Sequence, residues 1–225
     1  MKMRMFKHCP FPRAVAIFCT CWILALAAFF LHYFAWLRDY QMTWGATTEE
    51  AGRYMAGDEL LQDPAFNSTR AVVIEGSPEE IWPWIVQMGY KRAGFYAFDT
   101  LDNAGIPSAD TILPEHQDLA VGNTISLGGP QVKVVEMVPY SSMLWVFQEG
   151  PGPWATATWS WGLYRIDDEH TKLVSRLRLD YTFGSLQETI MYCMLDAGEI
   201  FMMRTCLLGI KLRVETKEQE IDGKR

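Results

Sequence analysis

Residues 14–37 carry no formal charge, and this long apolar run constrains the fold more than any other part of the sequence. At the rise of an α-helix the run would span about 36 Å, which is enough to cross the hydrocarbon core of a bilayer. Trp36 and Tyr40 lie at its end, where aromatic side chains favour the membrane–water interface. The sequence therefore predicts one transmembrane helix over residues 14–37.

Residues 1–13 contain four basic residues and no acidic residue. Basic residues favour the cytoplasmic side of a membrane, so we expect a basic cytoplasmic N-terminus and an extracytoplasmic C-terminal domain in a single-pass membrane protein. A cleaved signal peptide is the alternative, because Ala25-Leu26-Ala27 has the pattern of a cleavage site. The apolar run continues beyond that site, which favours a retained anchor.

The rest of the chain is acidic. The sequence contains 20 Lys and Arg residues against 27 Asp and Glu residues, and every acidic residue follows the apolar run. An acidic surface repels a phosphate backbone, so we expect no nucleic-acid partner. The 49% of apolar residues excludes a disordered chain.

Common catalytic and metal-binding patterns are missing from the sequence. It has no G-x-S-x-G, H-E-x-x-H, Walker, G-x-G-x-x-G or C-x-x-C motif. The four histidines are scattered, and no two have the spacing of metal ligands on one element. We therefore expect no metal site and no cofactor, and the sequence identifies no catalytic residue.

Residues 38–68 are expected to connect the membrane helix to the domain. They should contain a short helix, because Thr47 and Glu50 have the spacing of a capping box. Residues 69–75 alternate as a strand does, and a second capping pattern then opens a helix that should run to about residue 88.

From residue 121 the apolar period changes to two, which predicts a meander of antiparallel strands after a short helix at 96–104. One face of this sheet should be exposed to solvent. Arg176 and Arg178 alternate with apolar residues there, and we expect them to be solvated. The expected strands cover residues 123–128, 131–138, 143–148, 155–166 and 171–181.

Residues 186–215 have a helical apolar period, and we expect two helical pieces or one helix kinked at Gly198. Residues 216–225 should form a polar tail. The helix carries an apolar stripe that is expected to pack on the sheet. The stripe comprises Met194, Ala197, Phe201, Leu208 and Leu212.

Five segments of the sequence are specific enough to compare with known families. They are WGAT at 44–47, TRAVVIEGSPEEIWPWIVQMG at 69–89, AGFYAFDTLDN at 93–103, LPEHQDLAVGN at 113–123 and LLGIKLR at 207–213. Together they resemble the SRPBCC superfamily, in particular its polyketide cyclase and dehydrase-like branch of often membrane-anchored bacterial proteins.

The resemblance implies an α+β fold of the helix-grip type, which is START-like or Bet v1-like. In this fold an antiparallel sheet wraps around a long C-terminal helix, and here it would occupy residues 69–215 after the transmembrane helix. Family members enclose an apolar cavity and bind lipids, hormones, polyketides or other hydrophobic compounds. The resemblance therefore implies a hydrophobic small molecule or lipid as partner, without identifying it.

A block of polar and aromatic residues follows the expected helix that ends near residue 88. Its side chains could point into a cavity mouth and hold the polar end of a ligand. The alternative is a structural role, in which these groups bond helix ends and loops. An ion pair between Arg92 and Asp99 would fit the block. Its members are Gln87, Arg92, Tyr96, Asp99 and Asn103.

His116 and four tryptophans complete the candidate ligand-binding residues. Three acidic residues lie near His116 in sequence and could orient its imidazole, whereas the alternative is a solvated loop. The indoles could line a ligand cage, or they could be plain core. These tryptophans are Trp84, Trp145, Trp159 and Trp161.

Three functions remain open at this point. The first is membrane-anchored binding of a hydrophobic small molecule or lipid in an internal cavity, without catalysis. The alternative is a cyclase, dehydrase or hydrolase-type enzyme in which Tyr96, Asp99 or His116 transfers a proton. The third is an interaction protein that presents a sheet edge or its acidic face to a partner.

Overall fold

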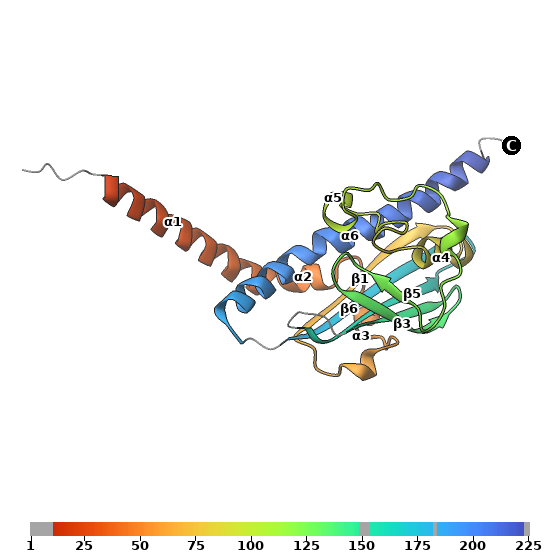
Figure 1. Ribbon diagram of the computed structural model, residues 1–225, viewed down its shortest axis with the longest axis horizontal. Coiled ribbons are helices and arrows are strands. Elements are labelled where there is room, and N and C mark those ends of the chain that lie inside the picture. The colour runs from red at the N-terminus through yellow and green to blue at the C-terminus, as the bar shows by residue number, and fades with distance from the viewer. Residues whose placement is uncertain (1–10, 149–153, 182–183, 223–225) are drawn as a thin grey trace, which may run out of the picture. The chain divides into compact units, whose positions relative to one another are not determined.

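The computed structural model describes residues 11–148, 154–181 and 184–222. These residues fall into two compact units, which divide between Tyr40 and Gln41. Figure 1 labels helices and strands of both units.

The first unit is helical. Helix α1 (Phe11–His32) continues through a π-helical turn, η1 (Tyr33–Leu37), into α2 (Arg38–Met42). The helix between Arg13 and Met42 is long and apolar enough to cross a membrane, judged by length and composition. This agrees with the long apolar helix expected from the sequence. Its retention as a membrane anchor and the side of the membrane on which the domain lies stay predictions.

The second unit is built on one six-stranded antiparallel sheet with the order β1-β6-β5-β4-β3-β2. Strands β2 to β6 pair with their neighbours in sequence, and β6 also pairs with β1. This arrangement confirms the predicted meander. The strands are β1 (Phe66–Glu75), β2 (Thr124–Ser126), β3 (Gln131–Val138), β4 (Ser142–Phe147), β5 (Trp154–Arg165) and β6 (His170–Tyr181).

Two helices begin with the capping boxes that the sequence predicts. They are α3 (Thr48–Gly52) and α4 (Pro78–Val86). In each box the hydroxyl of Thr47 or Ser77 accepts a hydrogen bond from the main-chain N–H three residues later. The glutamate at that later position bonds back to the N–H of the cap. Both helix starts are therefore determined by local sequence.

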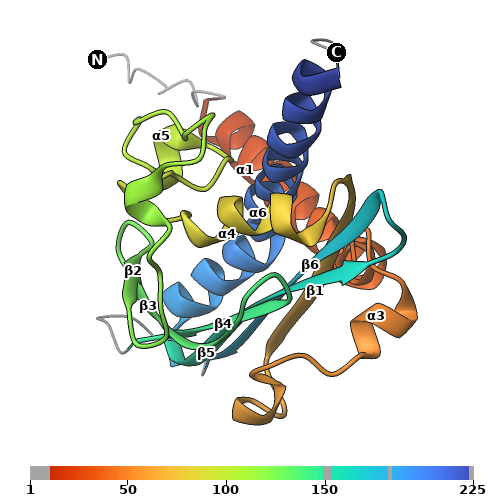
Figure 2. The same ribbon diagram turned by 90° about the vertical axis from the view of Figure 1, so that its right-hand side faces the viewer.

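One continuous helix, α6 (Leu186–Asp222), lies along the concave face of the sheet. Figure 2 shows the curved sheet around α6, with α4 on the same side and α3 on the opposite side. The strand order and this helix form the α+β helix-grip arrangement, so the predicted fold class is confirmed. The helix has no break at Gly198 and extends into the segment expected to be a polar tail.

The face of α6 that packs on the sheet differs from the predicted stripe. Leu207 and Ile210 are fully buried in the core, whereas Met194, Phe201 and Leu212 are each more than 60% exposed. The prediction that these three residues pack on the sheet is wrong, because α6 carries apolar side chains on more than one face. Its periodicity alone did not identify the buried face.

The outer face of the sheet is covered around β6, and the prediction that Arg176 and Arg178 are solvated is wrong. Both side chains are buried beneath residues 50–62. Asp58 accepts a hydrogen bond from Nη1 of each arginine, and Arg176 also donates to three main-chain carbonyls of that segment. The segment before β1 folds back onto the sheet and supplies the partners that allow these charges to be buried.

Replacing Asp58 with alanine should leave two buried guanidinium groups without their shared carboxylate. We expect Asp58→Ala to lower the free energy of unfolding by about 3–5 kcal/mol, measured by denaturant titration of the full-length protein in detergent. The control is Glu79→Ala, which removes an exposed ion pair with Arg165 and should cost less than about 1 kcal/mol. Equal losses in the two variants would contradict the structural role of Asp58.

Two glycines of α6 should respond in opposite directions to the same substitution. A Cβ at Gly209 would lie 2.2 Å from the main-chain oxygen of Tyr96, whereas a Cβ at Gly198 would meet no atom within 4 Å. We expect Gly209→Ala to destabilise the protein by about 1–3 kcal/mol through overpacking. Gly198→Ala should stabilise it by about 0.5–1 kcal/mol through helix propensity. Denaturant titration of both variants checks the sign of each effect.

Candidate functional site

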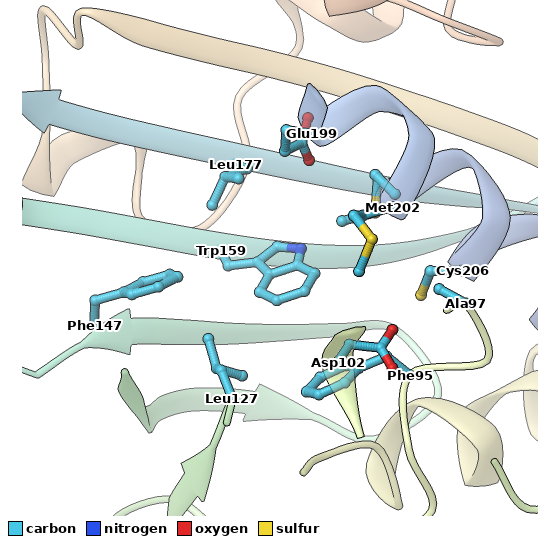
Figure 3. A pocket seen from close by; sticks show the side chains of 11 residues that line it. Phe95, Ala97, Asp102, Leu127, Phe147, Trp159, Leu177, Glu199, Met202 and Cys206 are labelled. Atoms are coloured by element: carbon cyan, nitrogen blue, oxygen red, sulfur yellow. The ribbon is translucent and has the colours of Figure 1, made fainter. Parts of the chain in front are cut away.

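An apolar cavity of about 200 Å³ lies between the inner face of the sheet and α6 (Figure 3). Strands β4, β5 and β6 each contribute a wall residue, and α6 closes the opposite side. The segment before α5 (Asp99–Asp102) and the turn after β2 complete the walls. The larger apolar side chains that line the cavity are Phe95, Leu127, Phe147, Trp159, Leu177 and Met202.

A second cavity of about 140 Å³ adjoins the first. The two share Phe147, Leu177 and Glu199 as wall residues, and the second extends toward Phe66 and Tyr192. For comparison, an apolar cavity of about 150 Å³ in another protein binds benzene. The interior of this domain therefore has room for a small hydrophobic molecule.

Two carboxyl groups interrupt the apolar walls of the first cavity, and one belongs to Asp102 of α5. Its Oδ2 atom accepts a hydrogen bond from the Phe98 N–H at 3.2 Å. Its Oδ1 atom is buried and has no hydrogen-bond partner among the residues that the structure describes. Burial raises the pKa of Asp102, and the nearby charge of Asp99 raises it as well.

The second carboxyl group belongs to Glu199 of α6. Its Oε2 atom accepts a hydrogen bond from Nη1 of Arg70, a fully buried side chain on the inner face of β1. Its Oε1 atom is buried without a hydrogen-bond partner within the described ranges. Burial raises the pKa of Glu199, although the positive charge of Arg70 acts in the opposite direction. Arg70 in turn donates from Nε to the Gln41 carbonyl at 2.7 Å.

Three of the predicted tryptophans form one cluster on the inner face of the sheet. The ring centroid of Trp159 lies 5.2 Å from that of Trp145 and 5.0 Å from that of Trp161. Trp159 lines the cavity and donates from its indole nitrogen to Ser175 Oγ at 2.8 Å. Trp145 and Trp161 are fully buried behind it. The cluster therefore belongs to the core and presents one indole to the cavity.

Gln87 and Tyr96 meet in the interior, but they bond each other and the main chain. The Gln87 side-chain amide donates to the Tyr96 hydroxyl at 2.9 Å, and that hydroxyl donates to the carbonyl oxygen of Trp84 at 2.9 Å. The Gln87 side-chain oxygen also accepts from the Leu113 N–H. The Trp84 ring packs edge-on against that of Tyr96. These contacts match the structural alternative considered for this block.

The other predicted polar residues also bond nearby backbone. Arg92 donates from Nη2 to the carbonyl oxygens of Val86 and His116. These acceptors take the place of Asp99, with which an ion pair was considered. Asp99 accepts a hydrogen bond from a serine hydroxyl instead. Asn103 is fully buried, accepts a hydrogen bond from the Lys91 N–H and donates one to the carbonyl oxygen of Ile106.

Tyr96 and Asp99 line a groove that is separate from the apolar cavity. An open groove of about 490 Å³ lies between the α5 region and α6, and Arg204 and Arg213 border it from the helix. Of the ten candidate residues, Trp159 alone is among the wall residues of the apolar cavity in the described part of the chain. The structure therefore does not bring the predicted set together at one site.

Sequence reasoning missed Asp102, Glu199 and Arg70. One available signal was the position of Arg70 in β1, because it alternates in phase with Val72 and Ile74, which pack in the core. An arginine on the inner face of a strand needs a buried partner, and an acid within the apolar closing helix is the natural one. Asp102 carried no comparable signal, since its burial depends on how its loop folds.

Comparisons with known proteins give distant structural similarities. No family model matches the chain, and no curated protein matches it. The START superfamily protein from Mycobacterium smegmatis is similar in structure, with 13% identity over 67% of this chain and 97% of its own and a TM-score of 0.42. XoxI from Bacillus cereus has 13% identity over 68% and 97% of the two chains and a TM-score of 0.42. Ara h 8.0201 has 11% identity over 67% and 97%, with a TM-score of 0.40.

The raised pKa of Asp102 predicts how stability depends on pH. The folded state binds a proton more tightly at Asp102 than the unfolded chain does, so this group's contribution to the free energy of unfolding falls as pH rises through the raised pKa. We expect the wild type to gain stability relative to Asp102→Asn when the pH is lowered from about 7 toward about 4. Denaturant titrations of both proteins across this range provide the measurement.

Asp167→Asn is the control with the opposite sign. A hydrogen bond from His170 lowers the pKa of the exposed Asp167, so its stabilising contribution is lost on acidification. The wild type should therefore lose stability relative to Asp167→Asn only below about pH 4, where this carboxyl begins to bind a proton. If the wild type gains no stability relative to Asp102→Asn between about pH 7 and about pH 4, the assigned burial of Asp102 is wrong.

Proposed function

We propose that this protein binds a hydrophobic small molecule or lipid in the cavity between the sheet and α6. The observation that supports this proposal is the cavity itself, about 200 Å³ of space bordered mostly by apolar and aromatic side chains. Apolar walls around a space of this size gain dispersion contacts from an apolar occupant. Few placed polar groups within apolar walls are typical of small-molecule sites.

The first unit supports a role at a membrane. A retained anchor would hold the domain close to a bilayer, where apolar molecules concentrate, and would raise their effective concentration at the cavity. We therefore propose membrane-anchored binding, with the domain on the extracytoplasmic side as the basic N-terminus predicts.

Binding is preferred to catalysis because of where the polar groups lie. Tyr96, Asp99 and His116 were the groups expected to transfer protons, and none is a wall residue of the cavity in the described ranges. Burial also raises the pKa of Tyr96, which keeps its phenol protonated and unsuited to act as a base. The alternative of a cyclase, dehydrase or hydrolase-type enzyme therefore gains no support from this arrangement.

A larger side chain in the cavity wall should weaken ligand binding. Ala97 lines the cavity, and we expect Ala97→Phe to weaken binding of the neutral fluorophore N-phenyl-1-naphthylamine at least about tenfold, because the larger side chain occupies the ligand's space. Energy transfer from tryptophan to the fluorophore is the measurement, made on the full-length protein in lipid nanodiscs. Trp159 lies in the cavity wall and is a suitable donor.

The matched control is Ala120→Phe, the same substitution at an exposed position. This variant should show the same energy transfer from tryptophan to the fluorophore as the wild type. It also corrects for fluorophore that is dissolved in the lipid. Transfer that is absent from the wild type, or equal in the two variants, would refute binding in this cavity.

A further inference from the structure

Helix α6 exposes apolar side chains where the outer side of a surface helix is usually polar. Its inner side is already buried in the core, at Leu207 and Ile210 among others. Over residues 186–216, Arg204 is the only exposed charged residue among those whose side chains the structure describes. The large apolar side chains that are exposed on α6 are Leu186, Ile190, Met194, Leu195, Phe201 and Leu212. Exposed apolar side chains gathered on one element indicate an interaction surface.

Four of these side chains share one face of the helix, and we call them the outer stripe. They are Ile190, Met194, Phe201 and Leu212, whose successive spacings in the sequence each return to within about 40° of the same direction on an α-helix. Arg204 follows at the edge of the stripe, and its guanidinium group lies 5.2 Å from the centroid of the Trp44 ring. A helix face that is apolar with a basic residue at its edge is suited to the interface of a bilayer.

The first half of α6 is tied to the residue at which the second unit begins. Gln41 donates from its side-chain amide to the Asp196 carbonyl at 2.8 Å, and Asp196 lies between Met194 and Phe201 along α6. Only residues 38–40 separate Gln41 from the apolar run in the sequence. If that run crosses a bilayer, the chain leaves the membrane within a few residues of a group that bonds this part of α6. A bilayer is then an apolar phase that the outer stripe can reach without any further partner.

A second copy of the chain is the other candidate to cover the outer stripe. It would bring two chains of net charge −7 together and would place Arg204 of each close to the same apolar surface. An anionic lipid surface instead attracts a basic residue that lies beside an apolar face. Charge therefore favours the bilayer over a second copy.

We propose that the outer stripe of α6 is a second membrane contact, which rests in the headgroup region of an anionic bilayer with Arg204 against the lipid phosphates. The domain would then lie on the membrane surface as well as being tethered to it. This inference rests on the anchor in the proposed function, and it does not require a ligand in the cavity.

A photoactivated side chain at the stripe tests the contact directly. The full-length protein is reconstituted in vesicles of phosphatidylcholine and phosphatidylglycerol with p-benzoylphenylalanine in place of Phe201, and lipid adducts are measured by mass spectrometry after irradiation. Tyr54 is the matched control position, because it is an aromatic residue with 67% exposure against 66% for Phe201. It follows α3, which Figure 2 shows on the opposite side of the sheet from α6. We expect at least about fivefold more lipid adduct at position 201 than at position 54.

A double substitution then tests the apolar character of the stripe. Ile190→Glu/Met194→Glu places two charges on it, so the lipid adduct at position 201 should fall to the level seen at position 54. Val121→Glu/Ile166→Glu is the control, with two apolar side chains outside α6 that are also more than half exposed, and it should keep the high yield. All four side chains are exposed, so these substitutions remove no core contact from the fold.

The outcomes separate this inference from the proposed function. If washing with sodium carbonate removes the full-length protein from the vesicles, the anchor fails and the inference fails with it. If the protein stays in the vesicles and positions 201 and 54 give similar adduct yields, the anchor stands and the second contact is refuted. Cross-links between two copies at position 201, in place of lipid adducts, also refute it and assign the stripe to self-association. An unchanged yield in Ile190→Glu/Met194→Glu refutes it as well, and fluorophore binding in the cavity is measured independently of all these results.

Discussion

Helix α6 contacts the sheet in two different ways along its length. In its second half, Leu207 and Ile210 are buried in the main core, and Gly209 lets the helix approach the neighbouring main chain closely. In its first half, the contacts with β1 include the ion pair between Glu199 and Arg70. An ion pair can join two elements without filling the space beside it, and both apolar cavities lie next to Glu199. Solid packing at one end of the helix and a polar connection at the other thus account for a cavity within a stable core.

Much of this fold could be predicted from local sequence, because its elements begin and end at residues with strong local preferences. The boxes at Thr47 and Ser77 start two helices, and period-two alternation placed five strands to within a few residues. The burial of Arg176 and Arg178 could not be predicted in this way. It depends on Asp58, which lies far away in sequence and reaches them only after the segment before β1 folds back.

The candidate site was much harder to predict, for a physical reason. Polar residues such as Gln87 and Asn103 are conspicuous in an apolar context, but such residues also make good internal braces, and here they bond main-chain groups. Asp102 and Glu199 resemble ordinary acids of a loop and a helix in the sequence. Their unpaired oxygen atoms arise from the tertiary arrangement, which no periodicity records.

Arg70 also connects the cavity to Gln41, the first residue of the second unit. Its guanidinium group holds the Gln41 carbonyl with Nε and Glu199 with Nη1, while the Gln41 side chain donates to the Asp196 carbonyl of α6 at 2.8 Å. Residue 41 is thus tied both to the strand and to the helix that border the cavity. Gln41 is the first residue of the second unit, so these hydrogen bonds hold the start of that unit to both walls of its own interior.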